Sequence, residues 1–456
     1  MDAAATVVAR VAIADRLSLP RKLGFTLGDY ACNIYWQSLS LFLLFFYTDV
    51  VGLSAATAGW IYMVASIWDG AIDPLIGAVA DRTRSRFGRY RPYILFGSVP
   101  LAVSFCLLYY KPPFQGTGLL VWLLATHIVL RTAYAVLNIP FMSLNARMTT
   151  SSSERSTLAG FRMLFATLAG LTVAYSTQPL VARFAGTGQG FMATAAVLAL
   201  LATALFPIVF AATREPPMEA SDHSPARLRD YWDAVRGNRA FWAVMFAVAL
   251  AAICATAWGK SVLYYFKYYL ADEGSSRLAL SLNAASGLVI IPIWMVASRY
   301  LCKRNAWFVA SAIGLAGLIV FALTDVRSVA FTIGLLLYMQ AAFLGLFMTF
   351  WSMMPDTVEY GEWRSGVRAE SFVFGFAQFF MKAALGFGAG LFGWALDWVG
   401  YVPNVAQSPQ TLAGLKNIMV FMPAIGIVIG IVAIALYPMG RGEHERIVAE
   451  IEARKR

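Results

Sequence analysis

Long apolar segments separated by short polar ones run along almost the whole chain. Each apolar segment is about 20 residues long, which is the length that an α-helix needs to cross the hydrocarbon core of a bilayer. We predict about twelve such helices in two groups of six, parted by the polar stretch from Thr213 to Arg239. The expected helices span residues 24–50, 56–80, 92–110, 118–144, 157–184, 189–212, 240–269, 278–299, 306–324, 329–354, 369–398 and 414–438.

Composition places these helices in a membrane. Hydrophobic residues make up 59% of the 456-residue chain and charged residues only 13%, whereas soluble domains carry about 25% charged residues. A chain of this size cannot hide so much apolar surface from water. We therefore predict an all-α integral membrane protein, with a six-helix bundle at 1–212, a cytoplasmic central loop at 213–239 and a second six-helix bundle with its tail at 240–456.

The net charge of +11 is concentrated in alternate loops. Arginine and lysine cluster in every second loop, in the central loop and in the C-terminal tail, whereas loops such as PPFQGTG and GYVPNVAQSPQ carry almost none. This is the positive-inside pattern, so we predict that both termini are cytoplasmic and that no basic face remains for nucleic acid. The N-terminal stretch is broken by Arg10 and Asp15, and we expect a cytoplasmic leader rather than a cleavable signal.

The stretch DPLIGAVADRTRSRFGRYRP at 73–92 resembles the signature between the second and third helices of the glycoside–pentoside–hexuronide:cation symporter family. Further blocks resemble that family in the expected order, namely GDYACNIYW with FFYTDVVGLS, NIPFMSLNARMT, YYFKYYL, PDTVEYGEWRSGVRAESF and GYVPN.

The resemblance implies a function as well as a fold. It implies the major facilitator fold, in which substrate binds between two halves. It also implies symport of a sugar (a glycoside, pentoside or hexuronide) with H⁺ or Na⁺ by alternating access, in the bacterial inner membrane. We expect no other cofactor and a monomer.

Asp69 and Asp73 lie four residues apart and share one face of the second expected helix. A charge near the bilayer centre costs about 2.5–3.5 kcal/mol on insertion scales, so a cavity or a partner must offset it. The two positions match the cation-site acids of the family, and Lys382, expected near mid-membrane, matches its eleventh-helix lysine. The resemblance thus implies a cation-coupling set that holds Na⁺ or carries H⁺. The alternative is a structural ion pair for the acids and a snorkelling lysine.

Three positions depart from the melibiose permease pattern of that family. Ile72 replaces an amide, Ala135 replaces a hydroxyl ligand, and Met142 replaces a stacking tryptophan. Fewer oxygen ligands weaken the argument for Na⁺ and favour H⁺.

Asn33, Asn138 and Arg162 are the candidate sugar-binding residues of the first half. Amides and a guanidinium hydrogen-bond adjacent hydroxyls, and arginine also binds carboxylates. The resemblance adds Tyr134 and Gln378. Because melibiose permease has acids at the positions of both asparagines, their loss beside an arginine argues against a melibiose-type galactoside and favours an anionic sugar. Interhelical hydrogen bonds are the alternative role for each asparagine.

Charged residues at the inner ends of the helices match the cytoplasmic gate network that the resemblance implies. These are Asp81, Arg82, Arg89 and Arg91. Arg131 is a further cation inside an apolar segment, which either snorkels to the outer interface or faces the cavity.

Two other classes of protein are alternatives to a sugar symporter. A membrane enzyme needs a nucleophile, a metal or an acid–base set, but His127, His223 and His444 are scattered and the four cysteines show no metal or disulfide spacing. We therefore expect no enzyme. A lysolipid transporter of the same superfamily is a stronger alternative than an enzyme, because Arg162 could bind the phosphate of a lysolipid. The polar amides favour a sugar instead.

Overall fold

The computed structural model describes residues 17–148, 152–187, 189–215, 235–324, 327–366, 370–439 and 443–455. Within these ranges the regular structure is helical and no strand occurs, which confirms the all-α prediction. The elements are α2 (Leu19–Ser38), η1 (Leu39–Leu43), η2 (Phe46–Val51), α3 (Ala55–Arg82), α4 (Arg91–Leu108), α5 (Gly116–Met148), α6 (Ser152–Arg183), η3 (Ala185–Thr187), α7 (Gly190–Ala212), α9 (Arg239–Tyr264), η4 (Tyr265–Tyr269), α10 (Glu273–Tyr300), α11 (Lys303–Leu323), α12 (Val329–Ser365), α13 (Glu370–Trp398), α14 (Pro409–Ala435) and α15 (Glu443–Lys455).

Eleven helices in the described ranges are long and apolar enough to cross a membrane. The expected first span is also helical from Leu19 to Val51, although two π-helical stretches interrupt it. The helices match the expected ranges to within a few residues, with one exception. α12 was expected to end at 354 but runs on to Ser365, so the whole helix is 37 residues long, or about 55 Å. Gly366, with a left-handed φ of 73°, ends it.

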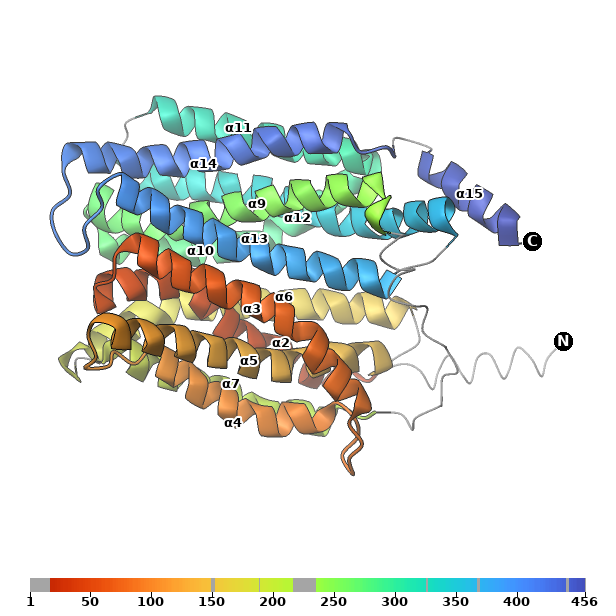
Figure 1. Cartoon of the computed structure of the whole chain (residues 1–456), viewed down its shortest axis with the longest axis horizontal. Coiled ribbons are helices and arrows are strands. Elements are labelled where there is room, and N and C mark those ends of the chain that lie inside the picture. Colours follow the sequence, from red (N-terminus) through yellow and green to blue (C-terminus); the bar gives the residue numbers. More distant parts are fainter. Residues whose placement is uncertain are drawn as a thin grey trace. The chain divides into compact units, whose positions relative to one another are not determined.

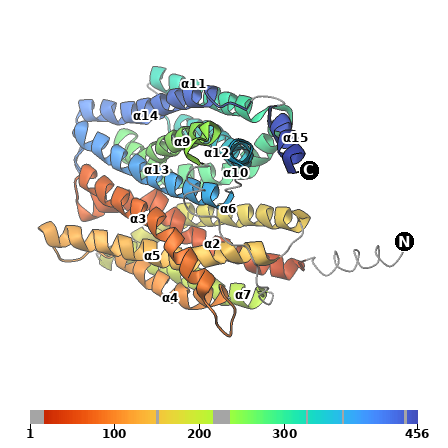
Figure 2. The same ribbon diagram turned by 45° about the vertical axis from the view of Figure 1, so that its right-hand side comes forward.

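Contacts between Cα atoms divide the chain into two compact units. The first contains residues 1–46 and 71–220, and the second contains residues 47–70 and 221–456, so α3 contributes to both. In the first unit α2 packs against α6 and α7, and α4 packs against α5 and α7. In the second unit α9 packs against α12, α13 and α14, as the views in Figures 1 and 2 show. The predicted division at 1–212, 213–239 and 240–456 stays a prediction.

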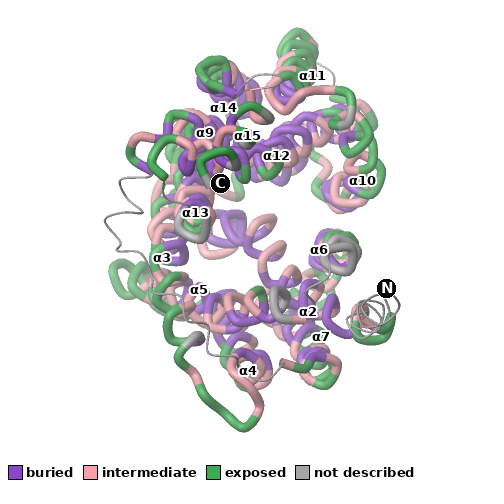
Figure 3. The backbone as a smooth tube through the Cα atoms, turned by 90° about the vertical axis from the view of Figure 1, so that its right-hand side faces the viewer, coloured by how far each residue is buried: buried purple, intermediate pink, exposed green. Residues whose placement is uncertain are grey.

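Burial within each unit follows this packing. Figure 3 shows long buried stretches along α9 and α12 and exposed ones along α10 and α11. The exposed positions are often apolar, as at Leu200 (71% exposed), Leu323 (82%) and Leu436 (74%). Large apolar side chains in such numbers on the outside suit hydrocarbon rather than water.

Glycines let α13 approach the first part of α3 closely within the second unit. A Cβ atom added at Gly393 would lie 2.2 Å from the carbonyl oxygen of Ala55, and one added at Gly59 would lie 2.9 Å from that of Ala389. Small residues at membrane helix contacts allow such backbone approach. The close contact fixes how the polar residues of the two helices lie relative to each other.

Candidate functional site

Asp69 and Lys382 form an ion pair inside the second unit. Lys382 Nζ lies 3.2 Å from Asp69 Oδ2, and the Asp69 side chain is fully buried while that of Lys382 is 14% exposed. α3 and α13 touch here too, because a Cβ atom at Gly70 would lie 2.9 Å from the ring of Phe379. Pairing offsets part of the desolvation penalty of two buried charges. The structure thus places Lys382 beside Asp69, and the role of both in cation coupling stays a prediction.

Asp73 lies one helical turn after Asp69 on α3, in the part that belongs to the first unit, and it is half-buried. Its neighbour Ile72 is half-buried and Ala135 on α5 is buried. Neither of these two side chains offers an oxygen to a cation.

Arg162 on α6 forms a bidentate ion pair with Asp29 on α2, in the first unit. Nε donates to both carboxylate oxygens, at 2.8 Å to Oδ2 and 3.0 Å to Oδ1, and Nη2 donates to Oδ1 at 3.0 Å. The side chains of Arg162 and Asp29 are 18% and 9% exposed. Asp29 was not among the residues expected at the site. An acid one turn before Asn33 in the apolar segment GDYACN was the signal that could have found it.

This ion pair weighs against the expectation of an anionic sugar. The expectation followed from the loss of acids at Asn33 and Asn138 beside an arginine with no known carboxylate partner. Since Asp29 supplies a carboxylate to Arg162 from a different position of α2, the pair carries no net charge.

Amide groups lie near this ion pair on α2 and on α5. Asn33 Nδ2 donates to the carbonyl oxygen of Asp29 at 2.8 Å. Asn138 is half-buried and makes no side-chain hydrogen bond within the ranges that the structure describes. One turn further along α5, Met142 Sδ accepts from Arg162 Nη2 at 2.7 Å. These polar groups on otherwise apolar helices suit hydrogen bonding to a hydroxylated ligand.

Tyr134 belongs to a cluster of aromatic and basic side chains in the first unit. Its ring centre lies 6.0 Å from that of Trp36. The guanidinium carbon of Arg131 lies 5.3 Å from the Trp36 ring, and Arg131 Nε donates to His127 Nε2 at 3.3 Å. Arg131 is only 3% exposed. Of the two alternatives for Arg131, this burial does not support snorkelling, because the side chain packs on Trp36 and His127.

The remaining predicted site residues are spread over both units. Gln378 is exposed on α13 in the second unit, and Arg82 is exposed at the end of α3. The side chain of Asp81 lies outside the described part of the molecule. Their roles in sugar binding and gating stay predictions.

Arg89 and Arg91 belong to the connection between α3 and α4. The carboxylate of Glu215 accepts backbone N–H hydrogen bonds from Arg89 at 2.7 Å and from Arg91 at 2.9 Å. A carboxylate at a helix N-terminus is stabilising, so Glu215 anchors the start of α4. The gate that these arginines were expected to form stays a prediction.

A second polar cluster surrounds Asp49, whose side chain is 1% exposed. Asp49 Oδ1 accepts from Lys267 Nζ at 2.7 Å and from the Tyr268 hydroxyl, and Oδ2 accepts from the Tyr401 hydroxyl at 2.8 Å. Asn404 Nδ2 donates to the Asp49 carbonyl oxygen at 2.6 Å. Burial and the Asp49 charge raise the pKa of Tyr401, so its hydroxyl keeps its proton as a donor. The cluster ties η2, η4 and the turn after α13 together.

A third cluster joins α11, α12 and α15. His444 Nε2 contacts Glu359 and lies 3.5 Å from Asp356 Oδ1, and these three are close enough together to hold a metal ion. Lys303 Nζ lies 2.6 Å from the same Asp356 oxygen. An ammonium group there competes with any cation, so the cluster fits an ion-pair anchor for α15 better than a metal centre.

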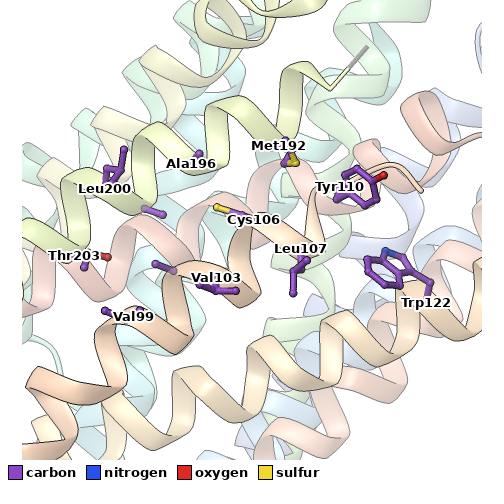
Figure 4. Close-up of a pocket in the computed structure, with 12 residues that line it drawn as sticks. Val99, Val103, Cys106, Leu107, Tyr110, Trp122, Met192, Ala196, Leu200 and Thr203 are labelled. Carbon is purple, nitrogen blue, oxygen red and sulfur yellow. The ribbon is translucent and has the colours of Figure 1, made fainter. Parts of the chain in front are cut away.

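A cavity of about 590 Å³ lies in the first unit and is lined by α4, α5 and α7; Figure 4 shows the side chains that line it. Apolar side chains such as Val103, Leu107 and Leu200 make up most of its wall. The Thr203 hydroxyl lies 3.4 Å from that of Tyr35. A sugar needs several hydrogen-bonding groups, so this cavity does not suit one.

Comparisons with known proteins place this arrangement in a family. Residues 24–441 match the family described as MFS/sugar transport protein. The chain is 32% identical over 442 residues to the isoprimeverose transporter of Lactiplantibacillus pentosus, covering 94% of this chain and 91% of that one. It is 31% identical over 450 residues to the uncharacterized symporter YnaJ of Bacillus subtilis, covering 96% of each.

Solved structures show the same fold at low sequence identity. One, described as giving structural insights into substrate recognition in proton dependent oligopeptide transporters, superposes with a TM-score of 0.70 at 13% identity. The match covers 94% of this chain and 99% of that one. This likeness confirms the major facilitator fold.

Proposed function

The chain belongs to the MFS/sugar transport protein family and is a membrane transporter, not an enzyme; from this premise we propose that it carries out cation-coupled symport of a sugar by alternating access. The sugar is a glycoside, pentoside or related compound, and the cation is H⁺ or Na⁺. The observation that carries the proposal is the buried ion pair between Asp69 and Lys382 on membrane-spanning helices. Ionisable groups at such positions are costly and by default functional.

The pair supports a specific coupling step. Lys382 Nζ already holds Asp69 Oδ2, so a coupling cation must compete with the ammonium group. A proton neutralises Asp69 and releases Lys382, whereas Na⁺ has to displace it and find further oxygen ligands. Because the side chains of Ile72 and Ala135 carry no oxygen, fewer ligands are available to Na⁺, and the proposal favours H⁺ over Na⁺.

The sugar is proposed to contact the polar face of the first unit. The Arg162–Asp29 pair, Asn33 and Asn138 provide donors and acceptors there. The same pair disfavours the lysolipid alternative, since a phosphate would meet an arginine that a carboxylate already binds.

Uptake into proteoliposomes tests the proposal. Purified protein should accumulate a radiolabelled sugar such as isoprimeverose or a methyl xyloside when an inward H⁺ or Na⁺ gradient is imposed, and excess unlabelled sugar should compete. The gradient that drives uptake identifies the cation. Competition by lysophosphatidylcholine but by no sugar would contradict the proposal.

A further inference from the structure

We propose that Asp29 determines the charge class of the substrate: by neutralising Arg162, it makes the site select uncharged sugars over uronates and other anionic sugars. The inference rests on the proposed function, since it names the substrate class of the same site. It also replaces the expectation of an anionic sugar that follows from the two asparagines alone.

The Asp29 carboxylate occupies the edge of Arg162 that an anionic sugar would need. Arginine recognises a carboxylate best through two parallel N–H donors. In this site Nε and Nη2 are those donors, and both already bind Asp29 at 2.8–3.0 Å. Nη2 also donates to Met142 Sδ. A sugar carboxylate therefore cannot bind to Nε and Nη2 of Arg162 without displacing the Asp29 carboxylate.

The donors that remain on Arg162 suit a hydroxyl group. Nη1 carries two N–H groups and has no hydrogen-bond partner within the described ranges. A carboxylate placed beside Nη1 would be attracted by Arg162 and repelled by Asp29, and two opposite charges a few Å apart largely cancel at that point. An uncharged hydroxyl accepts the same hydrogen bond without that repulsion. Arg162 thus acts as a hydrogen-bond donor and not as a counter-ion.

Among the side chains that the structure describes, the neighbours of the pair do not restore a positive charge. Asn33 and Asn138, the nearby polar candidates, are both neutral. Arg131 lies two turns before Asn138 on α5, but it is 3% exposed and packs against Trp36 and His127. With 9% and 18% exposure, Asp29 and Arg162 are also poorly screened by water, so their mutual neutralisation persists at ordinary ionic strength.

Matched ligands test the role of Asp29. Methyl glucosides and methyl galactosides are compared with the corresponding glucuronides and galacturonides, which differ only in a carboxylate for the hydroxymethyl group, and isoprimeverose is added as a further uncharged ligand. Affinities are measured on the purified full-length protein, on Asp29→Asn and on Asp29→Glu. Asp272→Asn is the control, because Asp272 caps α10 outside the membrane spans and asparagine caps equally well.

We expect the wild type to bind uncharged sugars at least about tenfold more tightly than the uronides. Asp29→Asn should move that ratio toward the uronides by at least about tenfold, whereas Asp29→Glu and the control should keep the ratio of the wild type. A wild type that prefers uronides, or a folded Asp29→Asn variant with an unchanged ratio, would overturn the proposal. If Asp29→Asn fails to fold, the proposal is tested by the affinity ratio of the wild type for uncharged sugars and uronides. Failure of the wild type to bind any sugar would instead contradict the proposed function.

Discussion

Asp69 is fully buried, and Lys382 lies 3.2 Å from it. Asp29 is nearly buried, and Arg162 binds both of its carboxylate oxygens. Each pair brings two opposite charges together on apolar helices, where either charge alone would be costly. Under the proposed function, a coupling cation would compete with Lys382 for Asp69, and a sugar hydroxyl would accept a hydrogen bond from Arg162. At the scale of single residues, these two pairs are the features that a transport mechanism can use.

Removing Lys382 should destabilise the protein more than removing the whole ion pair. Lys382→Met leaves the buried Asp69 carboxylate without its ammonium partner, and breaking a buried pair in this way costs about 3–5 kcal/mol. The double variant Asp69→Asn/Lys382→Met carries neither charge and should recover part of that loss. The measurement is the melting temperature of each purified variant. Strictly additive losses would show that the two side chains do not interact.

The contact between α13 and α3 matters at the scale of helices. The backbones approach so closely at Gly393 and Gly59 that no side chain fits between them. Asp69 on α3 and Lys382 on α13 therefore face each other across a rigid contact. A shift of either helix would separate the pair.

Gly393→Ala tests this contact. The added methyl group would lie 2.2 Å from the Ala55 carbonyl oxygen, and such overpacking costs about 1–3 kcal/mol. Gly375→Ala on the same helix is the matched control, because a Cβ atom there meets nothing within 4 Å and alanine favours a helix by about 1 kcal/mol. We expect a lower melting temperature for Gly393→Ala only. Equal melting temperatures for both variants would contradict the close approach.

The orientation of the whole molecule in the membrane can be tested by cysteine labelling. The distribution of arginine and lysine predicts that both termini and the central loop are cytoplasmic. In a variant without the four native cysteines, a membrane-impermeant maleimide added to cells should label Thr117→Cys and Val405→Cys. Ser221→Cys in the central loop should stay unlabelled until the membrane is permeabilised. Labelling of Ser221→Cys in intact cells would reverse the orientation.

The helices could be predicted from the sequence because a bilayer demands about 20 consecutive apolar residues for each span. Asp69 and Lys382 could be singled out for a related reason, since charges inside such segments are rare and costly. The family resemblance made Lys382 a plausible partner of these acids, and the ion pair with Asp69 agrees with it, but hydrophobic patterning alone does not give that pairing. The pairing of Arg162 with Asp29 was not expected. Arg162 and Asp29 are 133 residues apart, and Lys267 and Asp49 are 218 apart. These pairings depend on which faces the helices turn toward each other, which hydrophobic patterning does not specify.

Asp69 is proposed to couple a cation to sugar transport, and the variant Asp69→Asn tests this role. The amide keeps the size of the side chain but neither ionises nor binds a cation as a carboxylate does. In proteoliposomes this variant should still exchange labelled for unlabelled sugar, yet it should lose accumulation of sugar driven by the H⁺ or Na⁺ gradient. Asp272→Asn should keep both activities. Accumulation by Asp69→Asn equal to that of the wild type would show that the acid is structural and contradict the mechanism.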